Sequence, residues 1–414
     1  MVFAFKNVAI YLQCISVVIH QQANTNRQDF QNKKPIKMKR QYILFSLALL
    51  MAGCTQTTPV TSDLEINPQN AVDVLFEDVA CNVKVVPLKS DELLHDCTYV
   101  RCYGDELVMV DTQKEWVYYF KDNELQGTLH SLGRGPGEYN MIDYYEYDSK
   151  GKILYIVSLS GNDAIMRYSV PDMKYIGKLN VGKRVECVRV YDENTLLLGV
   201  KEGDGGALVL FDIPSETIKE TICELTGHGL SYSDRSIFDN GDDGMFVARY
   251  GVTSSISELK DGNLNCILKY DFGEDGAEQV FYNDLNGPSA ADAYLGYIFS
   301  PASDTKFTGG KFIRQNASGL SFWYSTLLGD EKNSRYFRMD GDKQVHLKGF
   351  NVPGLNKPMV PSCSTPDGYA TVICGDAESL ADTSVEASPL AKEILKTISL
   401  LVDNYMVVVY YDIR

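Results

Sequence analysis

The stretch "KILYIVSLSGNDAIMRYSVPDMKYIGKLN", residues 152–180, contains three short apolar runs in close succession. The runs cover residues 152–158, 164–170 and 175–180, and each is rich in aliphatic and aromatic side chains. Gly, Asn, Asp and Pro, which favour turns, lie between them. Short apolar runs bounded by such residues are typical of β-strands. The stretch therefore predicts three consecutive strands joined by short turns.

Triplets of the same kind recur before and after this stretch. Their first runs align on six anchor residues, which are 46, 43, 49, 75 and 49 positions apart: Leu107, Ile153, Leu196, Met245, Leu320 and Tyr369. A period of roughly this length with several strands per unit is the signature of β-propeller blades. We therefore predict an all-β fold, a six-bladed β-propeller, with an insertion at about residues 273–310 between blades four and five. The alternative, two β-sandwich domains, explains neither the regular triplets nor the lack of a mid-chain linker.

The last repeat is short, since "YATVICG" (369–375) has only one obvious successor, "MVVVYYDIR" (406–414). A propeller must join its first blade to its last, and the early run "CNVKVVPL" (81–88) can supply the missing strand. Between the two late runs lies a predicted helix that begins at Ser388 and Pro389, and it places Ile394, Ile398 and Leu401 on one face. We expect this C-terminal helix to cover blade six.

The N-terminal part carries an export signal. Residues 38–54, "MKRQYILFSLALLMAGC", combine a basic start, an apolar run too short to span a bilayer, and small residues before a cysteine. This pattern predicts a lipoprotein signal peptide at 38–53 and lipidation of Cys54; the alternative is an ordinary cleaved secretion signal. Residues 1–37 then form an upstream extension that a start assigned too early would explain. Residues 54–75 are polar and Thr-rich, which predicts a flexible tether, and 76–414 form the propeller.

Charge and cysteine content limit the partners and cofactors. The whole chain has a net charge of −16, and removing residues 1–53 leaves 32 basic and 54 acidic residues, a net of −22. So acidic a chain predicts no nucleic-acid partner and no attraction to anionic membrane surfaces, so that contact with the membrane is through the lipid alone. The eight cysteines after Cys54 have neither CxxC nor metal-ligand spacing. We predict no metal and no cofactor, and Cys363 with Cys374 as the pair that a disulfide would join.

The segment "SLGRGPGEYN" (131–140) lies between the last strand of blade one and the first of blade two. Its residues Gly133, Arg134, Gly135, Gly137 and Glu138 form a predicted crossing loop, in which the glycines permit positive φ or close backbone approach. The spacing is not a dinucleotide fingerprint, because a strand and not a helix follows. We expect a turn pinned by an Arg134–Glu138 ion pair, with a direct ligand contact as the alternative.

Several of these features together resemble those of a known family. The "GRGPGEY" motif, the blade spacing, the cysteine after the signal and the ending "DNYMVVVYYDIR" are similar to those of the TolB-like six-bladed β-propeller lipoproteins, over residues 76–414. The resemblance implies the propeller fold and a location in the bacterial cell envelope, which we expect to be the outer membrane, on either of its faces. It supplies no agreed reaction and no catalytic residues. The closing strand departs from the family in having "DNY" where Asp-Asn-Pro is usual.

Arginines precede three of the anchors at nearly equal distances. Arg101, Arg189 and Arg314 lie six, seven and six residues before their anchors, in the segments that should form the innermost strands. Glu146 holds the equivalent place in blade two, and Arg235 lies slightly further back in blade four, next to Asp234. We expect these side chains to face a common axial channel.

Two hypotheses follow for this arginine group. Buried guanidinium groups need partners, so the first is a structural role in which Glu146, Glu186, Asp234 and backbone carbonyls satisfy them. The second is a channel that binds an anion through the bidentate fork of arginine.

No catalytic constellation stands out in the sequence. The histidines after Cys54 lack metal-ligand spacing, and there is no G-x-S-x-G motif. We therefore predict a membrane-anchored, non-catalytic binding or scaffolding module for a protein, peptide or glycan. The alternative is a propeller enzyme of the lactonase or lyase type that acts at the mouth of the channel.

Overall fold

The computed structural model describes residues 63–414 apart from several gaps. These gaps are 91–93, 95–98, 112, 160–162, 203–204, 226–236, 240–244, 250–253, 277–303, 318, 327–330 and 402–405. Within the described ranges, no helix is long and apolar enough to cross a membrane.

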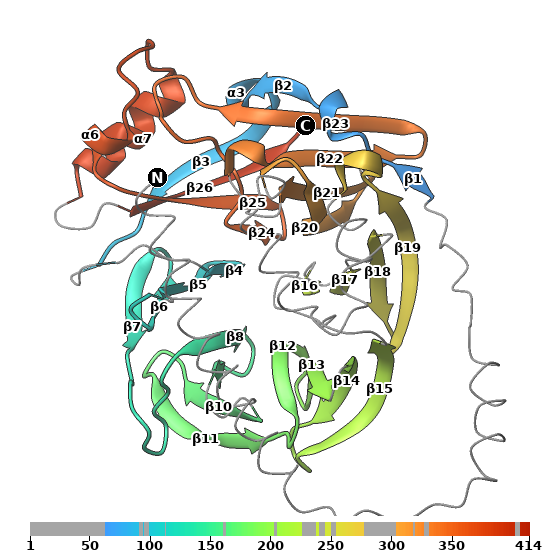
Figure 1. Cartoon of the computed structure of the whole chain (residues 1–414). Helices are drawn as coiled ribbons and strands as arrows, with labels where there is room; N and C mark the ends of the chain where they lie inside the picture. Colours follow the sequence, from blue (N-terminus) through green and yellow to red (C-terminus); the bar gives the residue numbers. More distant parts are fainter. Residues whose placement is uncertain are drawn as a thin grey trace, which may run out of the picture. The chain divides into compact units, whose positions relative to one another are not determined.

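Six sheets are arranged around a ring, each with its first strand innermost (Figure 1). Blades one to three each consist of four consecutive strands. They are β4 (Tyr99–Tyr103), β5 (Glu106–Asp111), β6 (Trp116–Lys121) and β7 (Glu124–Leu129); β8 (Ile142–Asp148), β9 (Ile153–Ser158), β10 (Ala164–Ser169) and β11 (Lys174–Asn180); and β12 (Arg184–Asp192), β13 (Thr195–Glu202), β14 (Gly205–Asp212) and β15 (Thr217–Leu225).

Blades four to six are built in the same way, but each also takes a strand from the N-terminal part. Their consecutive strands are β16 (Ile237–Asp239), β17 (Met245–Arg249), β18 (Ser254–Lys260) and β19 (Asn263–Asp271); β20 (Phe307–Asn316), β21 (Gly319–Thr326), β22 (Arg335–Asp340) and β23 (Lys343–Asn351); and β24 (Cys363–Thr365), β25 (Gly368–Cys374) and β26 (Met406–Ile413). All six anchor residues lie in the second strand of a blade, so the predicted six-bladed propeller is confirmed.

The second strands of the blades are largely apolar and buried because both of their faces are covered by neighbouring blades, as in β5, where every residue is buried. In β5, Leu107 and Met109 pack toward blade six, whereas Val108 and Val110 pack toward blade two. Successive side chains of a strand point to opposite faces, so a continuous apolar run serves two blade interfaces at once. The core is therefore a series of layers between neighbouring blades.

The ring closes as predicted. Strand β3 (Ala80–Pro87) is the outer strand of blade six and pairs antiparallel with β26, where Val86 lies opposite Val408. The first part of the chain and the last thus share one sheet, which protects both strand edges.

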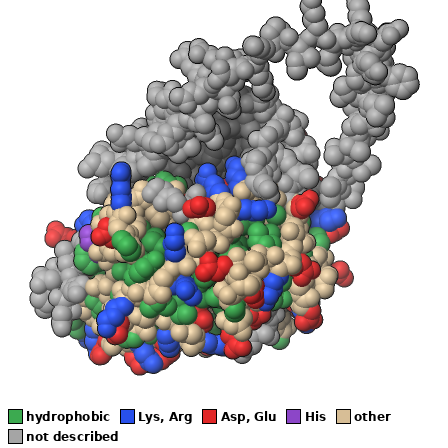
Figure 2. Space-filling view, turned by 90° about the horizontal axis from the view of Figure 1, so that it is seen from below, with side chains coloured by type: hydrophobic (Ala, Val, Ile, Leu, Met, Phe, Trp, Pro, Cys, Tyr) green, Lys and Arg blue, Asp and Glu red, His purple; other side chains and the backbone are tan. Residues whose placement is uncertain are grey.

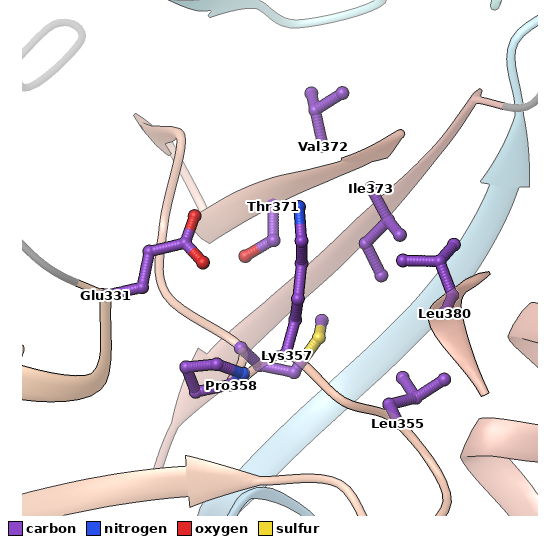
Figure 3. A pocket seen from close by; sticks show the side chains of 9 residues that line it. Glu331, Leu355, Lys357, Pro358, Thr371, Val372, Ile373 and Leu380 are labelled. Carbon is purple, nitrogen blue, oxygen red and sulfur yellow. The ribbon is translucent and has the colours of Figure 1, made fainter. Parts of the chain in front are cut away.

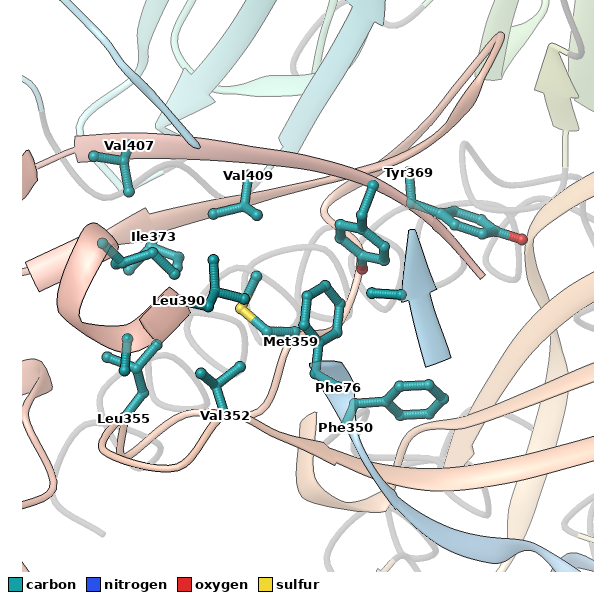
Figure 4. Packing of buried hydrophobic residues seen from close by; sticks show 14 of the residues in the cluster. Phe76, Phe350, Val352, Leu355, Met359, Tyr369, Ile373, Leu390, Val407 and Val409 are labelled. Atoms are coloured by element: carbon teal, nitrogen blue, oxygen red, sulfur yellow. The ribbon is translucent and has the colours of Figure 1, made fainter. Parts of the chain in front are cut away.

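A helix covers this sixth blade, also as predicted. Helix α7 (Pro389–Ser399) begins at Ser388, whose Oγ accepts a hydrogen bond from the Ala391 amide at 3.1 Å. Its buried residues Leu390, Ile394 and Ile398 belong to one cluster with side chains of β25 and β26, and Leu401 packs on the same cluster. Figure 4 shows Leu390 beside Ile373, Val407 and Val409. The short helix α6 (Ala377–Leu380) precedes it, and the 3₁₀ helix η6 (Glu331–Asn333) lies between β21 and β22.

The predicted boundary between tether and propeller at residue 76 is wrong. Strand β1 (Leu64–Glu65) pairs in parallel with β19, and β2 (Val72–Leu75) pairs in parallel with β23. The 3₁₀ helix η1 (Pro68–Asn70) connects them, and helix α3 (Phe76–Val79) leads on to β3. The segment covers the outer edges of blades four, five and six in turn, because an outer strand otherwise leaves its backbone groups unpaired. Residues 1–62, including the predicted signal peptide and Cys54, lie outside the described residues.

The predicted insertion falls between β19 and β20. The 3₁₀ helix η4 (Gly273–Asp275) follows β19, and β20 already begins at Phe307, a little before the expected end of the insertion. The central part of the insertion lies outside the described residues.

Candidate functional site: the crossing loop and the inner strands

The crossing loop between β7 and β8 is tightly held by hydrogen bonds. The Tyr139 amide donates to the Ser131 carbonyl at 2.8 Å, and the Gly133 amide donates to the Tyr139 carbonyl at 2.9 Å. Two hydroxyls fix the tip, since Ser131 Oγ and Tyr168 Oη donate to the Gly137 carbonyl at 3.0 and 2.9 Å. The loop is therefore a fixed part of the scaffold and not a loose connection.

Two of the three glycines are required by this geometry. Gly137 has φ +75, and a Cβ there would lie 2.5 Å from Cγ of Tyr175. Gly133 has φ +157, which side chains of L residues rarely adopt, and a Cβ there would lie 1.9 Å from Oε2 of Glu138. Gly135 has no positive φ, and a Cβ there would meet only the flexible end of Glu138, at 3.1 Å. The expectation that all three glycines are needed is thus correct for Gly133 and Gly137 only.

The predicted Arg134–Glu138 ion pair is absent from the described contacts. Glu138 Oε2 instead accepts a hydrogen bond from the Gly135 amide at 2.7 Å, because the backbone amide lies three residues away within the same turn. Arg134 is exposed, and so are Leu132 on the same loop and Tyr175 of β11, with exposed fractions of 47% and 38% for the last two. The loop therefore presents an apolar side chain and a cation on a fixed backbone, beside an aromatic ring.

Glu115, which belongs to no motif in the sequence, connects the loop to blade one. It lies in the turn between β5 and β6, and its Oε2 accepts a hydrogen bond from the Ile142 amide at 2.5 Å. Its carbonyl accepts the Tyr139 hydroxyl at 2.9 Å. Burial, opposed by the Ile142 hydrogen bond and reinforced by the charge of Asp111, raises the pKa of Glu115 to about 7. The side chain thus holds a proton under conditions in which most carboxyl groups have lost theirs.

A pH-dependent stability follows from this raised pKa. Between about pH 4.5 and 7 the folded protein holds a proton that the unfolded chain has released, so its free energy of unfolding decreases as the pH rises through this range. Glu115→Gln keeps an acceptor for the Ile142 amide but carries no charge. We expect the variant to gain up to about 3 kcal/mol over wild type at pH 8 and almost nothing at pH 5.

Urea denaturation at several pH values measures this difference. Glu124→Gln is the matched control, because Glu124 is exposed and pairs with exposed Lys89. If the free energy of unfolding changed with pH in the same way in wild type and in Glu115→Gln, Glu115 would not be protonated in the folded protein.

On the inner strands, two of the predicted arginines converge on one carboxylate. Arg101 of β4 and Arg189 of β12 both form ion pairs with Oε2 of Glu146 on β8, the second at 3.4 Å. Arg189 also donates to the Val188 carbonyl at 2.8 Å, and the Tyr103 hydroxyl donates to Glu146 Oε1 at 3.2 Å. Glu146 and Arg189 are 4% and 5% exposed. This group links the innermost strands of blades one, two and three, and it fits the structural hypothesis.

The other residues predicted for the axial channel lie elsewhere. Arg314 of β20 reaches blade six, where it pairs with Asp412 at 3.0 Å, donates to the Pro366 carbonyl and lies over the Tyr369 ring. Glu186 forms its ion pair with Arg184 of the same strand, at 3.5 Å, and no ion pair with Arg101, Arg189 or Arg314 occurs among the described contacts. Arg235 and its neighbour Asp234 lie outside the described residues. The prediction that Arg314 faces the axial channel together with Arg101 and Arg189 is therefore wrong.

A second buried group of charges was not predicted. Glu106, at the start of β5, accepts hydrogen bonds from Tyr119 at 2.7 Å and Tyr147 at 3.0 Å, and it pairs with Lys152 of the next blade. Burial favours a raised pKa of Glu106, but these hydrogen bonds outweigh it and the pKa lies below its usual value. One feature of the sequence could have indicated this ion pair, since Glu106 and Lys152 each directly precede an anchor residue.

The described part of the molecule also has a small pocket and a surface with side chains of both charges. A pocket of about 30 Å³ lies against blade six, between Glu331, Lys357 and Thr371 (Figure 3), and it has room for about one or two water molecules. The face shown in Figure 2 mixes basic and acidic side chains, without a large patch of one sign. No group of three or more metal-ligating side chains occurs among the residues that the structure describes.

The six sheets around the ring, with β3 completing the sixth, define a closed six-bladed β-propeller. The profile of the family DUF5128, described as "6-bladed beta-propeller", matches residues 55–294, and the chain belongs to this family. A search of curated proteins found no match.

Among solved structures, the chain is similar to a protein of Bacteroides fragilis described as "Putative exported protein". The TM-score is 0.63 at 16% identity, over 83% of this chain and 98% of that one. A member of the duf4221 family from Bacteroides vulgatus matches with a TM-score of 0.49 at 8% identity, over 81% and 98% of the two chains. At these identities the first likeness shows the fold alone.

Proposed function

We propose that the protein is an envelope lipoprotein, anchored through a lipid on Cys54, whose propeller is a non-catalytic binding or scaffolding module. The observation that carries the binding role is the crossing loop, a hydrogen-bonded backbone that presents Leu132 and Arg134 beside Tyr175. An apolar side chain, a guanidinium and an aromatic ring suit a protein, peptide or glycan surface.

The location rests on the sequence and on resemblance. The signal at 38–54, the "GRGPGEY" motif of the TolB-like lipoproteins and the likeness to a protein described as exported all support an envelope location, and we propose the outer membrane. The enzyme alternative acts at the mouth of the channel. Of the candidate channel residues, Arg101, Glu146 and Arg189 are engaged in ion pairs with one another, which favours the binding role.

Anchoring is tested by Cys54→Ser. We expect the variant to move from the membrane fraction to the soluble fraction of the cell envelope. Each buried CH₂ of an acyl chain contributes about 0.8 kcal/mol to membrane binding, and all of this is lost with the chains. Cell fractionation with immunoblotting measures the change. Cys81→Ser is the matched control and should remain in the membrane fraction, and a Cys54→Ser variant that also remains there would exclude the lipid anchor.

Binding is tested by placing a photo-crosslinking amino acid at Arg134 in the full chain in living cells. A discrete cross-linked product is expected there and not with the same amino acid at Lys343, which is exposed on blade five. The product should weaken when Leu132→Ala is added. Identical patterns at the two positions would contradict a binding surface on the loop, and turnover of a lactone or a uronate-containing glycan by the purified protein would favour the enzyme.

A further inference from the structure

The seam between the first and last blades contains two thiols in direct contact. Cys102 lies on β4, the innermost strand of blade one, and Cys363 lies on β24, the innermost strand of blade six. Their Sγ atoms are 2.9 Å apart. Cys363 is 5% exposed and packs in the same apolar cluster as Val100 and Val408, whereas Cys102 is half-buried.

This contact replaces the pairing expected from the sequence. Cys363 lies opposite Ala370 in the sheet and Cys374 lies opposite Met406, and no disulfide joins them in the described part of the chain. The two strands that carry Cys102 and Cys363 belong to different sheets and share no hydrogen-bonded ladder. The seam between blades one and six is otherwise held by side-chain packing and by the chain that leads from β3 to β4.

We propose that Cys102 and Cys363 form a disulfide that joins blade one to blade six. A disulfide has sulfurs 2.03–2.05 Å apart, so little movement separates the thiols from the bonded state. The two residues are 261 positions apart in the sequence. A cross-link that closes so long a loop restricts the unfolded chain strongly, and it would join the innermost strands of the two blades directly, in addition to the chain that leads from β3 to β4.

The chemistry requires an external disulfide as oxidant. The Cys102 thiolate attacks one sulfur of that disulfide, which forms a mixed disulfide and releases one thiolate. Cys363 then attacks the Cys102 sulfur and releases the second. Two thiols of the protein are oxidised by two electrons, and the oxidant leaves as two thiols that take up the two protons.

The surroundings of the two thiols fit this order of events. The hydrogen bond with Cys102 and burial raise the pKa of the Cys363 thiol, so Cys102, which is less buried, is the one that reacts first.

The full chain is purified reduced, incubated with oxidised glutathione, alkylated under denaturing conditions and mapped by mass spectrometry. We expect loss of two alkylatable thiols and a linked pair of peptides that contain Cys102 and Cys363. The oxidised protein should melt about 5 °C or more above the reduced one. This difference should disappear in Cys102→Ser and in Cys363→Ser, and it should persist in Cys374→Ser.

Peptide mapping of the wild type decides the question even if these variants fold poorly. Full alkylation of both residues, a stable glutathione adduct on Cys102, or a link from Cys363 to Cys374 would each overturn the proposal. The reaction in purified protein is independent of export. The proposed envelope location supplies only an oxidising compartment in the cell, so failure of the anchor and failure of the disulfide are distinguishable.

Discussion

Glu146→Ala is expected to lower the free energy of unfolding by about 3–5 kcal/mol, the usual loss when one partner of a buried ion pair is removed. Glu146 is the carboxylate that Arg101 and Arg189 share, and Arg189 is almost fully buried. Its removal leaves two guanidinium groups close together without this counter-charge. Denaturant unfolding at pH 7 measures the loss.

The matched control for Glu146→Ala is Glu124→Ala, which removes an exposed partner of Lys89 and should change stability by less than about 1 kcal/mol. Added acetate should partly restore the stability of Glu146→Ala, since a free carboxylate can enter the space between the two arginines. A loss no larger than that of the control would show that the group does not hold the inner strands together.

Gly137→Val should be the second strongly destabilising change, with a loss of about 3 kcal/mol or more. The residue has φ +75, a conformation that a β-branched side chain adopts only with strain, and a Cβ would lie 2.5 Å from the Tyr175 ring. Thermal unfolding should show a lower melting temperature. The exposed surface formed by the loop and Tyr175 should be disturbed at the same time.

Gly104→Val separates the two causes, because Gly104 has φ +67 but no atom within 4 Å of the added Cβ. The stability lost in Gly104→Val measures backbone strain alone. The additional stability lost in Gly137→Val measures the clash with Tyr175. Equal losses would mean that the ring moves aside without cost.

The fold was predictable because its signal is long and repeated. The anchors, the closing strand β3 and helix α7 follow from runs of six residues or more, or from a recognisable helix start at Ser388. Strands β1 and β2 were missed because they have two and four residues, and parallel pairing along an outer edge requires no alternation of apolar and polar side chains.

The inner-strand group was only partly predictable, because the spacing fixes a strand position but not the partners in the neighbouring blades. Arg101, Arg189 and Arg314 each lie opposite the residue that follows their anchor. Arg101 and Arg189 find Glu146 on the blade between them, whereas Arg314 finds Asp412 in blade six. The spacing within one strand contains no information on such a partner. Glu115 was missed for a related reason, since its importance depends on Ile142, which follows in another blade.

The course of the N-terminal segment determines the order in which the blades can be completed. Blades one to three use only residues 99–225, so each can form from neighbouring parts of the chain. Blades four, five and six each take a strand from before residue 88, and blade six also requires β26 at the very end. Such pairing between distant parts of a chain is slow. Strand β3 must therefore wait for β26, and blade six, which closes the ring, is the blade that can be completed last.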